Sequence, residues 1–220
     1  LIASAGTTDF TFFLGDGSAA IPTANQIAGL SIKGIDFTEK LIPLFDDAWA
    51  QAIAEVSPTS CVPVLQDGDL TIWETMAILE YMADRHPDAG FWPTDVKARA
   101  VARSVSNEMH AGFTNLRGNM PMNIRKSLPD KGDGEGVDKD VARIQALWAD
   151  CRTRFGDGGD FLFGEFCNAD AMFAPVVSRL TTYCVELDDA SQKYVDAVQA
   201  LPAMIEWSEA GRVEPWVVDE

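Results

Sequence analysis

The sequence predicts a two-domain protein, with an N-terminal α+β domain followed by an all-α helical bundle. Short β-prone runs alternate with helical patterns in the first part of the chain. A linker with two prolines and a glycine follows over residues 85–95, and beyond it the apolar residues recur only at helical spacing. At 220 residues the chain is long enough for two small domains with hydrophobic cores. We therefore expect these domains over residues 8–84 and 96–220.

The first half of the N-terminal domain is predicted to alternate strand and helix. Phe10–Leu14 is a β-prone run that ends at a glycine, and a helix is expected over residues 23–33. A second strand is expected over residues 35–42 and a short helix over residues 46–56. Because a helix separates the first two strands, those strands should be parallel.

A β-hairpin and a helix complete the predicted domain. Residues 61–65 and 70–73 are apolar runs joined by the tight-turn dipeptide Asp67-Gly68. Pro63 has no backbone N–H to donate, so it is expected at a sheet edge or a bend, where a cis bond is allowed. A helix starts at Glu74, which gives the order βαβαββα that is typical of a thioredoxin-like domain.

The start of this last helix is a candidate binding site. Glu74-Thr75 brings a carboxylate, a hydroxyl and unpaired backbone N–H groups together, which suits the ammonium and carboxylate of an amino-acid-like ligand. The alternative is a strained turn followed by an ordinary helix N-cap.

The second domain is predicted to be helical throughout. Its first helix has an apolar stripe that includes Val105, Met109 and Phe113 and is expected to continue to about Pro121. A glycine-rich acidic connector over 129–136 separates it from the later helices, which are expected around residues 141–155, 168–183, 191–200 and 203–210.

Composition and charge exclude several functions. A net charge of −17 and a pI near 4.3 argue against nucleic acid or an anionic membrane surface as a partner. No apolar run approaches the ~18 residues of a membrane helix, so we expect a cytoplasmic protein. We expect no metal site, and we expect the cysteines in the second domain to be buried free thiols: Cys151, Cys167 and Cys184.

Several strings resemble the cytosolic glutathione S-transferase family. VPVL, DGDL, IWET and AILEYMADRHP are similar to its glutathione-binding half, and residues 92–123, 163–183 and 201–214 resemble helices of its second domain. The resemblance implies a homodimer that uses glutathione as co-substrate and transfers its thiol to a hydrophobic electrophile. By motif, glutathione would be held by Val62, Pro63, Glu74 and Thr75.

The sequence departs from the family where the thiol should be activated. Related bacterial sequences carry hydroxyl residues at the start of the first helix, and this chain has Ala19-Ala20-Ile21-Pro22-Thr23 there. In one hypothesis, amide groups at the helix start, aided by Thr23 or Asn25, stabilise the thiolate. In a second, Cys61 is a thiol that exchanges with glutathione or a substrate. In a third, activity is lost and the protein binds without catalysis. A specialised sulfur-transfer or ether-cleaving step is a further alternative.

The resemblance also suggests an acceptor pocket on the face of the second domain toward the cleft. Its candidate residues are Met109, Phe113, Arg117 and Tyr183, and each is also a plausible core or surface residue. His110 is expected to pack against a neighbouring helix.

Overall fold

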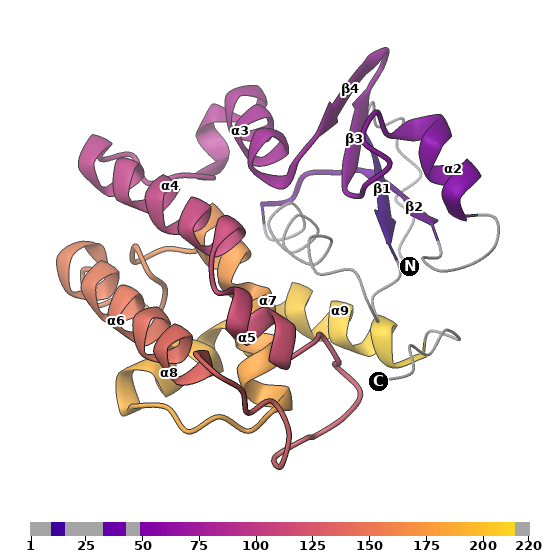
Figure 1. The fold of residues 1–220 in the computed structure, drawn as a ribbon. Helices are drawn as coiled ribbons and strands as arrows, with labels where there is room; N and C mark the ends of the chain where they lie inside the picture. The colour runs from indigo at the N-terminus through magenta and orange to yellow at the C-terminus, as the bar shows by residue number, and fades with distance from the viewer. Residues whose placement is uncertain (1–9, 16–32, 43–48, 214–220) are drawn as a thin grey trace.

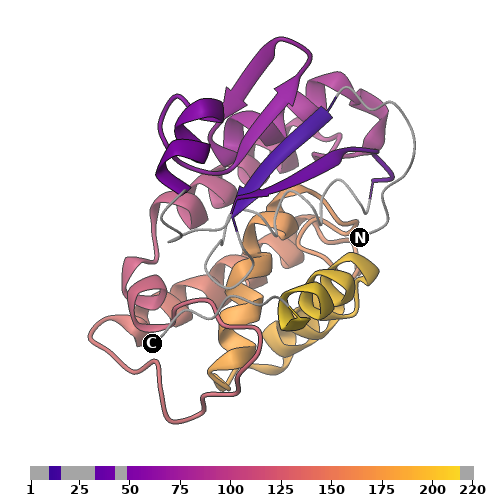
Figure 2. The ribbon, with the colours of Figure 1, turned by 90° about the vertical axis from the view of Figure 1, so that its right-hand side faces the viewer.

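A small sheet with two helices lies at one end of the molecule and a bundle of helices at the other (Figures 1 and 2). The computed structural model describes residues 10–15, 33–42 and 49–213. The termini and residues 16–32 and 43–48 lie outside the described residues, so the helix predicted over 23–33 does too.

The sheet contains four described strands in the order β2-β1-β3-β4. These are β1 (Phe10–Gly15), β2 (Thr38–Ile42), β3 (Val64–Asp67) and β4 (Leu70–Trp73). β1 and β2 are parallel, and β3 is antiparallel to both β1 and β4, which confirms the predicted topology. The predicted hairpin turns at Gly68, whose φ is +58°.

The edge-strand placement of Pro63 is wrong, and the alternative placement at a bend holds. β3 is an interior strand between β1 and β4, and both of its ladders end at Val64. Pro63 lies just before this point, where its missing N–H removes no ladder hydrogen bond.

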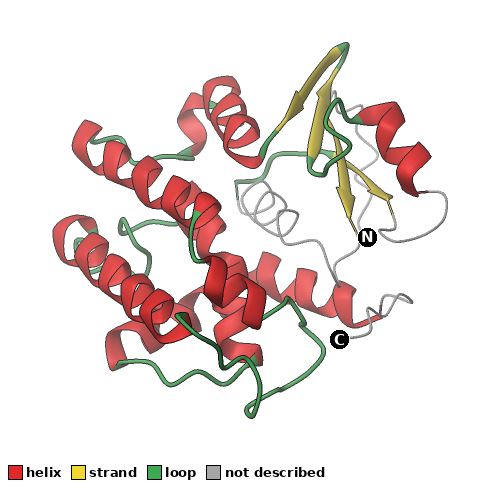
Figure 3. Ribbon diagram, viewed as in Figure 1, coloured by secondary structure: helices red, strands yellow, loops and turns green. Residues whose placement is uncertain are grey.

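The two faces of the sheet bury different side chains because successive residues of a strand point in opposite directions. On one face, Phe12 and Leu65 pack with Ile78 and Met82 of α3 (Thr75–Arg85). On the other, Phe13 and Val64 pack with residues of α2 (Trp49–Val56). Figure 3 shows these helices beside the strands.

The second domain is built around α7 (Asn168–Thr182), which is buried along almost its whole length. After a short 3₁₀ turn at Pro87–Ala89, the other described helices are α4 (Val96–Ala111), α5 (Thr114–Asn119), α6 (Val137–Phe155), α8 (Asp189–Gln199) and α9 (Pro202–Val213). None of the helices in the described ranges is long and apolar enough to cross a membrane. The predicted class, a thioredoxin-like domain followed by a helical domain, is confirmed.

The prediction of one long first helix is wrong. α4 ends at Ala111, and Phe113 has a left-handed φ of +54° before α5 begins. A Cβ at Gly112 would meet the Glu108 carbonyl oxygen at 2.6 Å, so glycine suits this break. The apolar stripe continues across it, because Met109, Phe113 and Leu116 are all buried in the same core.

Asp170 anchors the start of α7. Its carboxylate accepts hydrogen bonds from the Cys167 and Leu162 N–H groups at 2.9 and 3.0 Å and from the Tyr194 hydroxyl at 3.1 Å. Burial raises the pKa of Asp170 to about 6, although the hydrogen bonds to the carboxylate favour its charged form.

Direct contacts join the two domains. Arg103 of α4 binds the Glu80 carboxylate of α3 through two nitrogens, at 2.7 and 2.6 Å. The Asn168 N–H donates to the Phe91 carbonyl at 2.8 Å, so the start of α7 is tied to the linker.

Candidate functional site

The segment Cys61–Pro63 leads into β3, and the backbone of its middle residue, Val62, is unpaired among the described residues. The Val62–Pro63 peptide bond is cis, and Cys61 is exposed. The Ser57 side-chain oxygen donates to the Cys61 carbonyl at 2.7 Å and accepts from the Cys61 N–H at 3.1 Å. In the described part of the chain, the Val62 N–H and C=O have no hydrogen-bond partner. They remain available to an extended peptide laid alongside.

The hairpin brings this segment to the start of α3. Val64 pairs with Trp73, so Pro63 and Glu74 both lie immediately beyond the same end of the β3–β4 ladder. Glu74 is the N-cap residue of α3, with φ +71° and ψ 126°. A non-glycine residue in this conformation is uncommon.

The first N–H groups of α3 have no cap. Glu74 makes no side-chain cap hydrogen bond, and the first helical bond runs from the Ile78 N–H to the Glu74 carbonyl at 3.0 Å. The Thr75, Met76 and Ala77 N–H groups precede it. Such groups attract anions.

Thr75 is the most buried polar residue at this helix start. It is 3% exposed, and its hydroxyl has no hydrogen-bond partner among the described residues. This hydroxyl can therefore donate a hydrogen bond to a ligand carboxylate at the helix start.

Glu74 is faced by His110 from the second domain. The His110 Nε2 atom lies 3.7 Å from the Glu74 Oε2 atom. The Arg117 guanidinium donates to the His110 backbone carbonyl at 2.9 Å. The prediction that His110 simply packs against a helix missed this contact, because helical spacing carries no information about which side chain of another domain lies opposite.

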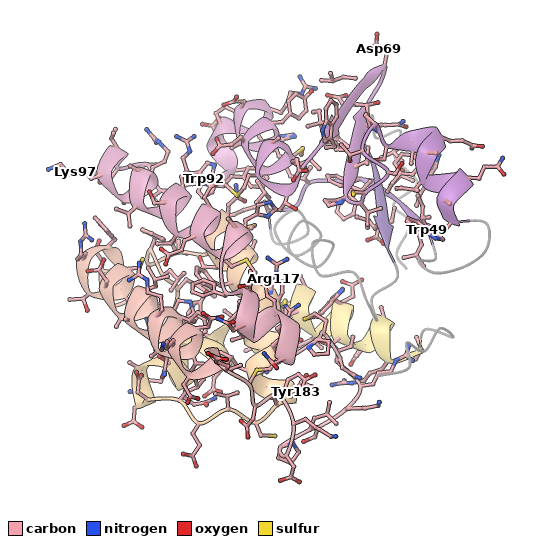
Figure 4. All side chains as sticks on the ribbon, in the orientation of Figure 1. Trp49, Asp69, Trp92, Lys97, Arg117 and Tyr183 are labelled. Carbon is pink, nitrogen blue, oxygen red and sulfur yellow. The ribbon has the colours of Figure 1, made fainter. Side chains whose placement is uncertain are left out.

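The four residues of the predicted acceptor pocket do not all lie together. Met109 and Phe113 are 4% and 7% exposed and belong to the core of the second domain. Figure 4 shows Arg117 on the side of α5 toward the N-terminal domain and Tyr183 on the far side. The Tyr183 hydroxyl donates to the Pro121 carbonyl at 3.1 Å, and Tyr183 lines a separate groove of about 360 Å³ with Met120 and Val137. The structure therefore does not bring Tyr183 together with Glu74.

The candidate catalytic residues come from two separate parts of the chain. Thr23 and Asn25 lie outside the described residues. Cys61 is exposed beside Val62, at the predicted binding segment.

The other cysteines separate into two groups. Cys151 and Cys167 are buried free thiols, and burial raises the pKa of Cys151 to about 12 and that of Cys167 well above its ordinary value. The expectation that Cys184 is buried is wrong, because it lies past the end of α7 with a φ of +52° and is exposed. No group of three or more His, Cys, Asp or Glu side chains in residues 10–15, 33–42 and 49–213 could hold a metal ion.

The sequence and fold match known proteins over most of the chain. The family model described as "Glutathione S-transferase, N-terminal domain" matches residues 28–85. Maleylacetoacetate isomerase from Rattus norvegicus is 33% identical over 163 residues, which cover 72% of this chain and 73% of that protein. The chain belongs to the glutathione S-transferase family.

Two further matches extend over more of the chain. A glutathione S-transferase from Triticum aestivum is 25% identical over 185 residues, covering 79% of this chain and 84% of that protein. A glutathione transferase homologue from Burkholderia gl BGR1, solved with bound glutathione, matches with a TM-score of 0.71 at 23% identity over 92% of this chain and 98% of that one. At 23% identity, the match to the Burkholderia structure shows a shared fold.

Proposed function

We propose that the protein is a glutathione-dependent transferase that joins the glutathione sulfur to a hydrophobic electrophile. The observation that supports this best is the uncapped start of α3, where the free N–H groups lie beside Thr75 and Glu74. The γ-glutamyl end of glutathione carries an α-carboxylate and an α-ammonium. The carboxylate suits the hydroxyl and the N–H groups, and the ammonium suits Glu74.

The rest of the tripeptide is assigned to Val62. Its unpaired N–H and C=O can exchange two hydrogen bonds with the cysteinyl residue of glutathione, as in the addition of a short β-strand. Pro63 has no N–H to donate and so ends the segment, and the β3–β4 ladder begins at the residue after it. In this proposal one continuous glutathione-binding surface is formed by Val62, Pro63, Glu74 and Thr75.

The proposed chemistry is nucleophilic. The glutathione thiol, with an ordinary pKa of about 8.5, loses its proton to solvent or a neighbouring base. The sulfur electron pair then forms a C–S bond while the leaving group departs with the pair from the bond that breaks. We retain Thr23 and Asn25 as candidates for stabilising the thiolate, and Cys61 as the candidate for thiol exchange. Met109, Phe113 and Arg117 remain the candidates for the acceptor side.

Isomerisation of a conjugated double bond is a second candidate. Rat and mouse maleylacetoacetate isomerases are 33% and 32% identical to this chain over 163 residues. In such a reaction the thiolate adds to the double bond, the new single bond rotates, and elimination returns the thiol unchanged. The exposed Arg117 guanidinium offers a cation for an acidic substrate.

Thermal-shift measurements with glutathione test the binding part of the proposal. We expect Thr75→Val to weaken binding about tenfold, because a hydrogen bond to a charged group contributes roughly 1.5 kcal/mol, and Glu74→Gln to weaken it similarly. Thr71→Val and Glu55→Gln, in the same domain but away from α3's start, are the matched controls and should bind normally. Equal binding by all four variants would refute the site.

Turnover separates the enzyme from a non-catalytic binding protein. A panel of aromatic halides, thioesters, aryl ethers and maleylacetoacetate distinguishes conjugation, ether cleavage and isomerisation by their products. Tight binding without any product would favour the binding protein. Loss of turnover in Thr23→Ala or Asn25→Ala would identify the activating group, whereas loss in Cys61→Ser alone would favour thiol exchange.

We also propose a homodimer. Leu70 and Trp73 on the edge strand β4 are 46% and 40% exposed, which leaves apolar surface for a second copy. Light scattering should give twice the chain mass of 23.9 kDa.

A further inference from the structure

A second groove of the helical domain is lined by the last turns of α6, the loop after it and the first turn of α8. These two helices lie on the side of the domain away from the sheet (Figure 1). The groove has a volume of about 440 Å³, which is large enough for a small organic molecule. None of the residues assigned to glutathione or to its acceptor lines it, so it is a separate candidate site.

The charged groups of this groove favour an anion, although the chain has a net charge of −17. Its lining carries Arg152 and Lys193 against the single carboxylate of Asp189. The groove beside Tyr183 has the opposite balance, with one lysine against three carboxylates. Lys193 makes no ion pair in the described part of the chain, and Arg152 donates to the Ala190 carbonyl at 2.8 Å. Both cations therefore have N–H groups left for a ligand.

The start of α8 adds backbone donors. The Asp188 carboxylate accepts from the Ser191 N–H at 2.7 Å, and the first helical bond runs from the Gln192 N–H to the Asp188 carbonyl at 2.8 Å. The Asp189 and Ala190 N–H groups have no acceptor among the residues that the structure describes, and both residues line the groove. Free N–H groups at a helix start attract anions.

Trp148 is the buried side chain of this groove that lacks a hydrogen-bond partner. It lines the groove and is 1% exposed, and its Nε1 atom has no acceptor within the described ranges. Its ring is held by packing against Phe173 and Tyr194, with ring centroids 5.8 and 4.7 Å away. A buried N–H without an acceptor is costly, so a ligand oxygen that reaches it would supply the missing hydrogen bond.

We propose that this groove binds an aromatic carboxylate. The carboxylate group is held by Arg152, Lys193 and the N–H groups of α8, because a planar guanidinium can bind both oxygens of one carboxylate. The aromatic ring packs against the apolar surface of Trp148 and Ala149. The site is separate from the start of α3, so this inference does not depend on the proposed function.

The indole N–H signals in heteronuclear NMR spectra test the site, with 2-naphthoate as the probe. The chain has six tryptophans, and Trp148→Phe identifies the Trp148 signal by its absence. Titration of the wild type at constant ionic strength should shift this signal until the site is saturated. 2-Naphthamide has the same ring without the charge and should bind about tenfold more weakly.

Variants of the two cations assign the charge recognition. Arg152→Gln should weaken 2-naphthoate binding about tenfold, because it removes a two-point contact to a charged group, and the exposed Lys193→Gln about threefold. Arg154→Gln is the matched control, since Arg154 is on the same helix but pairs with Asp150 at 2.7 Å, and it should bind normally.

The other outcomes overturn the inference. If 2-naphthoate shifts only the remaining tryptophan signals, or none up to its solubility limit, it does not bind in this groove. Equal affinity for 2-naphthoate and 2-naphthamide would show that the groove does not recognise the carboxylate. Unchanged affinity in both Arg152→Gln and Lys193→Gln would exclude the two cations as its binding groups.

Discussion

Replacing Asp170 with asparagine should change how stability depends on pH. Asp170 is fully buried, and burial raises its pKa from the ordinary 3.8 to about 6. The folded state therefore binds more protons than the unfolded state between these two pH values, so this group makes the protein less stable as pH rises. Each unit of difference between the folded and unfolded pKa values corresponds to about 1.4 kcal/mol in the free energy of unfolding, and most of this change in stability occurs below pH 6. Between pH 5.0 and 7.5 the wild type should lose about 1.4 kcal/mol that the variant does not.

Urea unfolding at these two pH values, followed by tryptophan fluorescence, measures the difference. Trp148 is a suitable reporter because its ring lies 4.7 Å from that of Tyr194, which donates to Asp170. Asp140→Asn is the control, since Asp140 is a less buried carboxylate that accepts one N–H, from Leu116. Tyr194→Phe keeps the carboxylate and removes a hydrogen bond that favours its charged form, so its pH dependence should be steeper than that of the wild type. The reasoning would be refuted if the free energy of unfolding changed by the same amount between the two pH values in the wild type and in Asp170→Asn.

Two further predictions concern buried groups in the second domain. Arg179 is fully buried, burial lowers its pKa to about 10, and its Nη2 atom has no partner among the described residues. Replacing this buried cation with a methionine of similar size, in Arg179→Met, should therefore change the free energy of unfolding by less than about 1 kcal/mol. Arg179→Ala should instead cost about 2–4 kcal/mol, because it leaves a cavity. A large loss in Arg179→Met would show that its hydrogen bond to the Met120 carbonyl dominates. Gly132→Ala should cost about 2 kcal/mol more than the control Gly158→Ala in urea unfolding, because both have positive φ but only at Gly132 would a Cβ meet Met120 and Tyr183, at 2.8 Å. Equal losses would contradict this.

The strands, the hairpin and the helix that follows it could be predicted because their signals are local. The Asp67-Gly68 turn, the apolar runs on either side of it and the helical spacing after Glu74 each lie within a few residues. The resemblance to the family added the candidate binding residues. The structure then placed Val62 and Glu74 at the same end of one ladder.

Features that depend on distant residues could not be predicted in this way. Whether Pro63 precedes an edge or an interior strand depends on the pairing of β3 with β1, a strand far away in the chain. The break at Gly112 leaves the apolar stripe intact, so hydrophobic spacing could not reveal it. The Glu74–His110 contact joins two domains, and nothing in the local sequence of either residue specifies it.

A crystal structure with S-methylglutathione would test the central claim most directly. We predict two hydrogen bonds between the ligand backbone and Val62, the α-carboxylate at the Thr75 hydroxyl and N–H groups of α3, and the ammonium at Glu74. Glutathione bound elsewhere, for example in the groove beside Tyr183, or no bound ligand at saturating concentration, would contradict the account.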